Sequence, residues 1–274
     1  MSHPARILTI AGSDSSGGAG IQADLKTILA LGGYGMSALT AITAQNTLGV
    51  TGVQGIEPEM VAKQIEAVLV DPGVDAIKTG MLLNRAIIEA IADVLDQHPA
   101  IPLVLDPVMV ATSGARLIDK DAQELVITRL LHRATLITPN LPEADALTGL
   151  RITDQQSLEA AGCIIRDLGA RAVLIKGGHR DGEEMVDWLY DGVEWTAFRA
   201  PRIHTTGGHG TGCTLASAIA TRLGQGMELK AAIESAKTYL NGALEHAWPG
   251  FGKGSGPLNH GWGMGAQPGG EWFH

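Results

Sequence analysis

The chain has 274 residues, of which 45% are hydrophobic and 18% charged, and its formal net charge is −9 at pH 7. This composition is that of a globular protein and excludes a disordered or fibrous one. Lys and Arg form no cluster that could follow a phosphate backbone, so we expect no nucleic-acid partner. No apolar run approaches the ~18 residues of a membrane span, and the apolar core of the N-terminus is too short for a secretory signal. We therefore expect no membrane partner and a cytoplasmic protein.

Short aliphatic runs alternate with runs of helical periodicity through most of the sequence. Strands are predicted at 6–12, 36–43, 76–80, 102–108, 135–140 and 172–178. Helices are predicted between them at 21–32, 58–70, 86–98, 121–131 and 156–169. Strands that are apolar on both faces and separated by helices indicate a mostly parallel sheet covered on both sides. The sequence therefore predicts an α/β, doubly wound fold of three layers.

The alternation changes after the last of these strands. Two adjacent strand-like runs, 185–192 and 193–201, are separated by Asp191-Gly192, a pair typical of a hairpin turn, so they should form an antiparallel edge. Two long helical segments follow at 213–226 and 229–247, and we expect them to pack on the sheet.

The segment from Pro249 onward is rich in Gly and Pro and has no periodicity. Before it, no linker, low-complexity block or repeat divides the chain. We therefore expect a single domain over residues 1–260 and a mobile tail over 261–274.

The chain has two cysteines, Cys163 and Cys213, whose spacing indicates neither a disulfide framework nor a zinc site. Cys163 lies among helix-spaced apolar positions and is predicted to be a small buried hydrophobe. Cys213 has no such surroundings. It lies where the glycine-rich stretch "HGTG" ends and a helix begins.

The stretch Gly210-Thr211-Gly212-Cys213 should form the first turn of that helix. Backbone N–H groups in a first turn have no partner within the helix, and together with the helix dipole they form an anion site. Glycines allow a phosphate to approach these groups closely. We predict an anion hole here in preference to an ordinary glycine-rich turn.

A thiol in such a first turn should have a lowered pKa, because a helix N-terminus favours the thiolate. Cys213 could then act as a base that takes the proton of an alcohol during phosphoryl transfer. It could instead act as a nucleophile, for which it would need a histidine partner, and His209 is the nearest one.

A second glycine-rich stretch, 11–27, follows the first predicted strand, yet it contains neither a GxGxxG fingerprint nor a P-loop. Other predicted strand ends carry Asp106, Asn140 and Glu143, whose oxygens could hold Mg²⁺. Asn140 and Glu143 could equally cap the next helix. Lys176, at another strand end, could offset phosphate charge or be solvated.

These stretches occur in an order that resembles one family. The combination of "AGSDSSGGAGIQADLKT", "TAITAQNT", "GML", "LDPVMVATSG", "TPNLPEADALTG", "IKGGH" and "HGTGCTLASAIA" is similar to the hydroxymethylpyrimidine/phosphomethylpyrimidine kinases of thiamin biosynthesis, in the ribokinase-like superfamily. The resemblance extends over roughly residues 5 to 260. Several motifs of ~7 residues in register are very improbable by chance.

The resemblance implies an enzyme that uses ATP and Mg²⁺ to phosphorylate 4-amino-5-hydroxymethyl-2-methylpyrimidine and then its monophosphate. It also implies a ribokinase-like, three-layer αβα fold and a homodimer. The residues that it assigns fall into four groups. They are catalytic Cys213, Gly210 and Gly212; substrate-binding Gln45, Asp24, Ala19, Met81 and Val108; nucleotide-binding Lys176, Asn140, Thr211 and His209; and metal-binding Asp106 and Glu143.

The side chain of Gln45 also makes chemical sense without the family, because its amide offers a donor and an acceptor to the amino group and ring nitrogen of an aminopyrimidine. The alternatives are a pyridoxal kinase of the same superfamily, a hydrolase with a cysteine nucleophile, and a pyrimidine sensor without turnover. The chain departs from its relatives at Gly207-Gly208, where they often have a more polar stretch.

Overall fold

The central sheet starts with β1 (Arg6–Ala11), whose successive side chains point into two separate apolar layers. Ile7 belongs to one buried cluster, and Leu8 belongs to the other. This alternation is what a strand covered on both faces requires. The computed structural model describes residues 3–109, 120–177 and 182–264, and the statements below refer to these residues.

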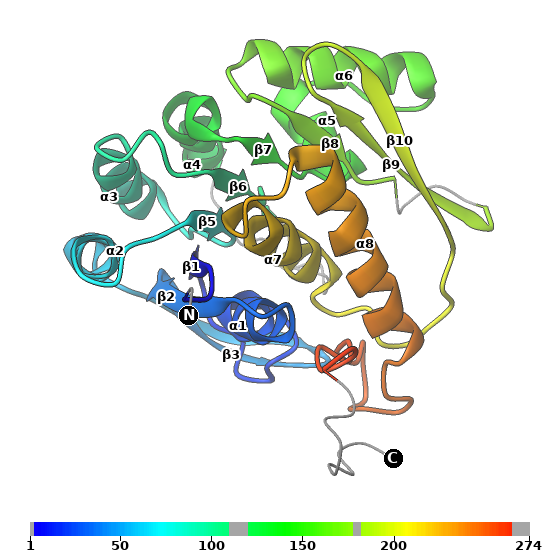
Figure 1. The fold of residues 1–274 in the computed structure, drawn as a ribbon, viewed down its shortest axis with the longest axis horizontal. Helices are drawn as coiled ribbons and strands as arrows, with labels where there is room; N and C mark the ends of the chain where they lie inside the picture. The colour runs from blue at the N-terminus through cyan, green and yellow to red at the C-terminus, as the bar shows by residue number, and fades with distance from the viewer. Residues whose placement is uncertain (1–2, 110–119, 178–181, 265–274) are drawn as a thin grey trace.

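In the described part of the chain, the main sheet has eight strands in the order β10-β9-β8-β7-β6-β5-β1-β2 (Figure 1). Within this order, neighbouring strands from β8 through to β2 pair in parallel, whereas β9 is antiparallel to both β8 and β10. The predicted parallel sheet with an antiparallel edge is confirmed. The strands other than β1 are β2 (Tyr34–Leu39), β5 (Ala76–Thr79), β6 (Leu103–Leu105), β7 (Leu136–Ile137), β8 (Val173–Ile175), β9 (Glu184–Tyr190) and β10 (Trp195–Pro201).

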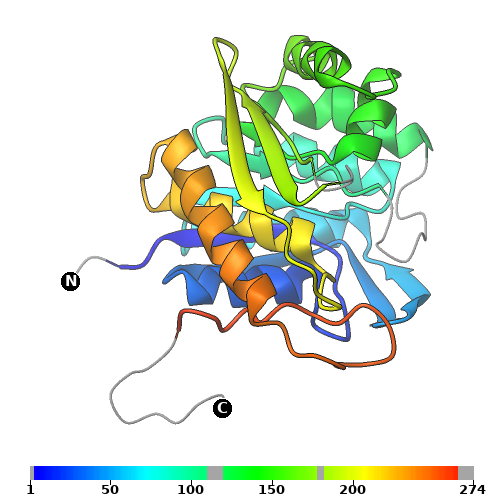
Figure 2. The same cartoon turned by 90° about the vertical axis from the view of Figure 1, so that its right-hand side faces the viewer.

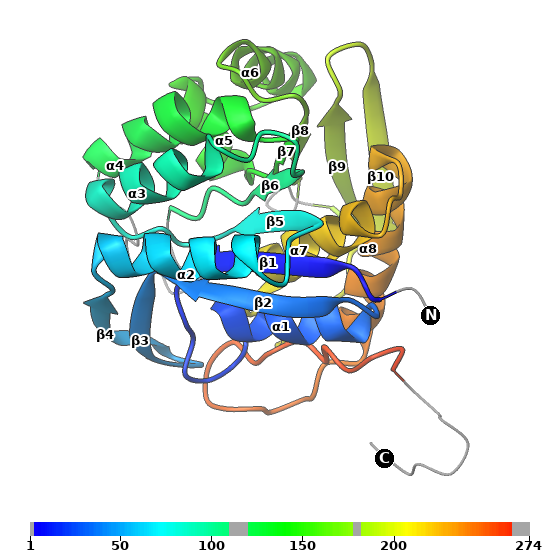
Figure 3. The same ribbon diagram turned by 60° about the vertical axis from the view of Figure 1, so that its left-hand side comes forward.

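Helices cover both faces of the sheet, as Figure 3 shows. One layer contains α2 (Pro58–Val70), α3 (Arg85–Leu95), α4 (Lys120–Leu125), α5 (Leu141–Thr148) and α6 (Gln155–Asp167). α4 continues through a π-helical turn, Val126–Leu130, and a 3₁₀ turn, Leu131–Arg133. The other layer contains α1 (Gly20–Ala30), α7 (Thr211–Gly224) and α8 (Leu229–Glu245). The three-layer αβα fold is therefore confirmed, and Figure 2 shows the β9–β10 hairpin beside α8.

The chain leaves the main sheet at Thr40, where a single strand over 36–43 was predicted. Thr40 is fully buried, its N–H donates to Ala11 O, and its hydroxyl donates to Met81 O. These contacts end β2 and redirect the backbone into a separate antiparallel hairpin, β3 (Ala41–Asn46) and β4 (Gly49–Gly55). The hairpin was not predicted, because alternating small and apolar residues continue across the break.

One further prediction was wrong, and another concerns residues of which only the first few are described. Cys163 is exposed, because α6 buries Leu158, Ala161 and Ile165 and turns Cys163 to the opposite side. The tail predicted over 261–274 is packed at its start, since Trp262 lies against Gly242 of α8. Residues 265–274 lie outside the described part of the chain. Within that part, no helix combines the length and the apolar character needed to cross a bilayer.

Candidate active site

A cavity of about 710 Å³ opens at the carboxyl edge of the parallel strands. Ligands of open α/β sheets bind at this edge, beyond the strand ends. The loops after β1, β5, β6, β7 and β8 and the start of α7 line the cavity, together with β3. Every site residue predicted from the sequence lines it except Asp24: Ala19, Gln45, Met81, Asp106, Val108, Asn140, Glu143, Lys176, His209, Gly210, Thr211, Gly212 and Cys213.

Two helix N-termini meet at the cavity. α7 starts after Gly210 and α1 after Ala19, and neither N-cap residue accepts a side-chain hydrogen bond from its helix. In α1 the N–H of Ile21 donates to Gly12 O. The first-turn N–H groups of Gly212 and Cys213 in α7, in contrast, meet no side-chain cap and are available to an anion. Gly210 is required by its surroundings, because its φ is +88° and a Cβ there would lie 1.8 Å from Gly18 O. The two turns thus fit together backbone against backbone.

The thiol of Cys213 lies between these two turns, and the N–H of Gly20 donates to it. Burial raises the pKa of this thiol to about 11, and the carboxylates of Asp24 and Asp106 add to the effect. Lys78 and the Gly20 N–H act in the opposite direction but do not prevail. The expectation of a lowered thiol pKa was therefore wrong. The position at a helix N-terminus was correct, but the sequence does not show that the half-buried Cys213 lies close to the carboxylates of Asp24 and Asp106.

Asp24, which was predicted to bind the substrate, lies outside the cavity lining. Its carboxylate is completely buried, 2.9 Å from Lys78 Nζ, and accepts hydrogen bonds of 2.6 Å from Thr9 and Ser217. Burial opposes the charge of Lys78, but Asp24, Cys213 and Asp106 together outweigh it and raise the pKa above the ordinary lysine value. Thr9, Lys78 and Ser217 are themselves fully buried. Asp24 therefore holds β1, β5, α1 and α7 together and does not line the cavity.

Asp106, Lys176 and Glu143 form a charged group at the next strand ends. Lys176 Nζ lies 3.2 Å from Asp106 Oδ1 and 4.0 Å from Glu143 Oε2. Burial raises the pKa of Glu143 to about 7, with Asp106 adding to the rise and Lys176 opposing it. Burial opposes the charge of Lys176, yet the two carboxylates raise its pKa above the ordinary value. The lysine is thus a cation fixed beside the anion hole, not a solvated side chain.

Asn140 and Glu143 form a capping box at the start of α5. Asn140 Oδ1 accepts from Glu143 N, and Glu143 Oε2 accepts from Asn140 N, both at 2.8 Å. The capping interpretation of this pair is therefore confirmed. Among the described residues, no three carboxylate, histidine or cysteine side chains gather as a metal site. The two carboxylates of Asp106 and Glu143 nevertheless fit Mg²⁺, which typically uses one or two carboxylates with substrate phosphates.

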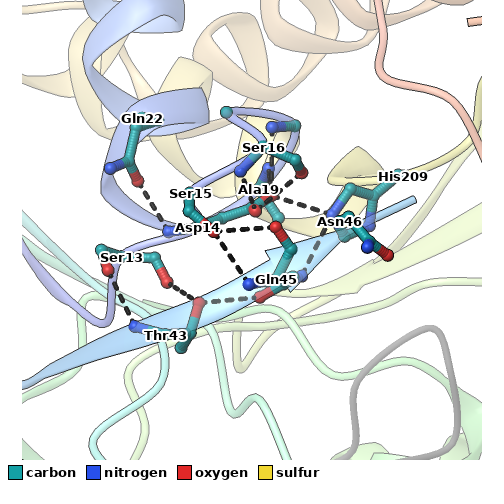
Figure 4. Close-up of polar contacts among 12 residues, drawn as sticks. Ser13, Asp14, Ser15, Ser16, Ala19, Gln22, Thr43, Gln45, Asn46 and His209 are labelled. Atoms are coloured by element: carbon teal, nitrogen blue, oxygen red, sulfur yellow. Dashed lines mark hydrogen bonds and ion pairs between the residues drawn. The ribbon is translucent and has the colours of Figure 1, made fainter. Parts of the chain in front are cut away.

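A polar network connects the loop before α1 with β3 and with the loop before α7 (Figure 4). Asp14 is 1% exposed and lies 2.9 Å from His209 Nε2. Burial opposes its ionisation, but hydrogen bonds from His209, Ser16 and Ala19 hold the pKa of Asp14 at about 2. Gln45 completes the network, with its Nε2 atom 3.2 Å from His209 Nε2.

Comparison with known proteins identifies the family. The family described as phosphomethylpyrimidine kinase matches residues 14–259, which is most of the chain. The chain belongs to this kinase family. A hydroxymethylpyrimidine/phosphomethylpyrimidine kinase of Streptomyces coelicolor is 49% identical over 262 residues, covering 96% of both chains. The thiamine biosynthesis bifunctional protein ThiED of Geobacter sulfurreducens is 52% identical over 93% of this chain, which spans 52% of that protein's length.

Solved structures of the kinase family and of a related one share the fold. A phosphomethylpyrimidine kinase from Clostridium difficile is 44% identical, with a TM-score of 0.78 over 87% of this chain and 99% of its own. A pyridoxal kinase from Staphylococcus aureus, in complex with AMP-PCP and pyridoxal, is 38% identical, with a TM-score of 0.87 over 95% of each chain. Sequence identity thus favours the first family, whereas overall shape fits both.

Sequence reasoning missed two residues of the cavity lining, Asp14 and Thr43, and the buried Lys78 behind it. Asp14 lies in the glycine-rich loop that was singled out, but an acidic residue in a polar loop gives no signal of its own. Lys78 is a lone charge in the apolar run "AIKTG", and a buried lysine needs a carboxylate partner. A lone lysine in an apolar run is therefore a sequence signal from which the buried Lys78 could have been predicted. Thr43 lies on the hairpin that was not predicted, so its position in the cavity lining could not be predicted either.

Proposed function

We propose that the protein transfers the γ-phosphoryl group of ATP to the hydroxyl of 4-amino-5-hydroxymethyl-2-methylpyrimidine, and then phosphorylates the monophosphate to the diphosphate, in thiamin biosynthesis. The observation that carries the proposal is the uncapped first turn of α7 around Cys213, open to the cavity. Membership of the kinase family and the names of its members support this substrate. A cavity of about 710 Å³ is large enough for a nucleotide and a small ring together.

In the first transfer, an oxygen–phosphorus bond forms to the alcohol, the bond from the γ-phosphorus to the β-bridging oxygen breaks, and the alcohol proton must leave. Cys213 Sγ takes that proton. The first-turn amides at Gly210 and Gly212 and the ammonium group of Lys176 stabilise the charge that spreads over the moving phosphoryl group. With its pKa at about 11, the thiol is mostly protonated near neutral pH, so only its thiolate form can take the proton and the first transfer should speed up as the pH rises.

The nucleotide would lie toward β9, β10 and α8. This part of the lining includes the apolar side chains of Met185, Ile203, Leu240 and Leu244, which suit a flat base. Asn140 and Thr211 are the predicted nucleotide contacts on the phosphate side, whereas His209, also predicted there, lies 3.2 Å from Gln45 of the acceptor site. Asp106 and Glu143 would hold Mg²⁺, which when bound neutralises phosphate charge. The ring of the acceptor would lie by Gln45, with Ala19, Met81 and Val108 around it.

Replacement of the thiol tests the proposal. In Cys213→Ala, we expect the first transfer to slow by ~10²–10⁴-fold, because base catalysis matters where a proton must leave. The second acceptor is already an anion, so its rate should change by less than about 10-fold on the same grounds. Mass-resolved product formation from each acceptor measures both rates. Cys163→Ala, at the exposed cysteine, is the matched control and should change neither.

An equal loss of both rates in Cys213→Ala would contradict the role of the thiol as a base. Pyridoxal kinase remains the second candidate, because the structural neighbour from Staphylococcus aureus has that activity in its name and a TM-score of 0.87. Offering both alcohols with ATP and weighing the products separates the two. A hydrolase would instead react with an acyl donor at Cys213 without ATP, and a sensor would bind the pyrimidine without forming ADP.

The assembly and location of the protein complete the proposal. We infer a homodimer, as the resemblance implies, and a cytoplasmic location. The β3–β4 hairpin supports an association between chains, because it exposes Ile42, Leu48 and Val53 by 47% to 63% of their surface. Apolar side chains gathered on one exposed element are typical of protein interfaces.

A further inference from the structure

The amide of Gln45 can lie in either of two orientations, and its neighbours decide between them. In the structure its nitrogen is 3.2 Å from Nε2 of His209, and its oxygen is 3.3 Å from Oγ1 of Thr43. A 180° rotation exchanges the two ends without changing the shape of the side chain. The choice therefore depends on which neighbouring atoms carry hydrogens.

At the first end, Asp14 decides the matter. Its Oδ1 accepts from the N–H and the hydroxyl of Ser16, and its Oδ2 accepts from the N–H groups of Gly18 and Ala19. A carboxylate surrounded by donors is ionised and can only accept. Because His209 Nε2 lies 2.9 Å from Oδ2, that nitrogen must carry a hydrogen. That one hydrogen is directed mainly to Asp14 Oδ2, and a protonated ring nitrogen has no lone pair with which to accept from an amide NH₂. The amide oxygen, which can share the hydrogen with Asp14, is therefore the only end of Gln45 that can pair here.

At the second end, Thr43 requires the same orientation. Its hydroxyl donates its one hydrogen to Ser13 O at 2.8 Å, and its own N–H donates to the Ser13 hydroxyl at 3.1 Å. The Thr43 oxygen is left with lone pairs, which can accept but not donate again. It therefore pairs with the amide nitrogen of Gln45. His209 and Thr43 thus favour the same orientation of the Gln45 amide.

We propose that Asp14 is a positioning residue that, through the Nε2–H of His209, fixes the Gln45 amide with its oxygen toward His209 and its nitrogen toward Thr43. Each end of the amide then keeps one hydrogen-bonding capacity, a lone pair on Oε1 and an N–H on Nε2. The lone pair on Oε1 can accept from the amino group of an aminopyrimidine, and the N–H on Nε2 can donate to the adjacent ring nitrogen. The reverse pairing is not possible. This inference rests on the proposed function, and it makes Asp14 a determinant of acceptor specificity at that site.

The hydrogen on His209 can be observed directly, without any assay of activity. Long-range ¹H–¹⁵N spectra of the whole protein report which imidazole nitrogens are protonated. We expect a proton on Nε2 of His209, as the neutral tautomer or the cation. His246 is an internal control of the opposite kind, because its Nδ1 lies 2.9 Å from Gly242 O and should carry the proton. A bare Nε2 on His209 would overturn the proposal, whether or not the protein is a pyrimidine kinase.

Two substitutions of His209 test the consequence for specificity. Gln places an amide N–H near the position of Nε2, whereas Met fills similar space and donates nothing. The readout is the KM for the aminopyrimidine alcohol relative to the same alcohol without its amino group. We expect His209→Gln to keep this preference within about threefold, and His209→Met to lose about 10-fold of it, the size of one hydrogen bond.

The control is His132→Gln, since that histidine is 52% exposed and lies outside the cavity lining. It should leave the preference unchanged. Equal behaviour of the Gln and Met variants, with the preference kept in both or lost in both, would overturn the proposal. If neither alcohol is phosphorylated, the proposed function fails, and the proton on His209 then decides the inference alone.

Discussion

α5 and α7 both start at the carboxyl edge of the sheet and both line the same cavity, yet their first turns are completed in opposite ways. α5 has a capping box in which Asn140 and Glu143 satisfy each other's backbone groups. α7 has a glycine N-cap with φ +88° and no side-chain cap. The first turn of α5 is thus satisfied by its own side chains, whereas that of α7 is open to a ligand.

The difference shows how a helix can be stable without a cap. A glycine at the N-cap in place of a capping side chain costs roughly a few tenths of a kcal/mol. α7 offsets this by packing, because an unbroken run of its residues from Thr214 to Thr221 is buried between the sheet, α1 and α8. Burial of aliphatic side chains contributes roughly 1.5–3 kcal/mol for each large residue. A buried helix can therefore leave its N-terminus free for phosphate chemistry.

The largest effect is expected from closing the open turn. Gly210→Ala would place a Cβ 1.8 Å from Gly18 O at a positive φ, so the turn must move. We expect both transfers to fall by about 10²-fold or more, the loss found when an anion-hole donor is displaced. Gly226→Ala is the control, since Gly226 also has a positive φ of +83° but a Cβ added there would meet no atom within 4 Å. It should cost about 1 kcal/mol of stability and leave rates intact. Similar rates in the two variants would contradict the role of the turn.

A smaller effect is expected from removing the cap of α5. Asn140→Ala should lower the free energy of unfolding by about 1 kcal/mol, because the N–H of Glu143 loses its acceptor. Asp154→Ala removes the equivalent cap of α6, outside the cavity lining, and should cost a similar amount. Only Asn140→Ala should also raise the KM for ATP. Urea denaturation and initial rates measure the two effects, and an equal KM in both variants would leave Asn140 with a structural role alone.

The smallest effect concerns the protonation of Glu143. Burial raises its pKa from 4.5 to about 7, so the folded protein binds a proton that the unfolded chain releases in this window. Because the folded state binds more protons, this carboxyl makes stability fall as the pH rises from 4.5 to 7. Glu143→Gln keeps a capping-box residue but cannot ionise. The unfolding free energy of the wild type minus that of the variant should therefore decrease from pH 4.5 to 7. A constant difference would contradict the raised pKa.

The fold could be predicted because its signals are local. Apolar strands such as Leu103–Leu105 and periodic helices such as Arg85–Leu95 need only neighbouring residues to be recognised. The exit of the chain at Thr40 could not be predicted. It depends on hydrogen bonds to Ala11 and Met81, which are distant in the sequence.

The site was predictable in its position but not in its electrostatics. Glycines and polar residues at strand ends indicate the cavity, since such ends meet at one edge of a parallel sheet. The destination of Asp24 depends on Lys78 and Ser217, which lie 54 and 193 residues away. The pKa of Cys213 depends on the burial that this arrangement creates. Long-range partners of this kind have no signature in a single sequence.

The small sheet of β3 and β4 stands apart from the layers that hold Cys213 and Lys176. Gln45, the side chain that would discriminate between acceptor rings, therefore belongs to a peripheral unit, while the apparatus that moves phosphate is anchored in the interior. Substitutions on the hairpin can therefore alter acceptor recognition while Cys213 and Lys176 stay in place, provided that the contact of Gln45 with buried His209 is kept.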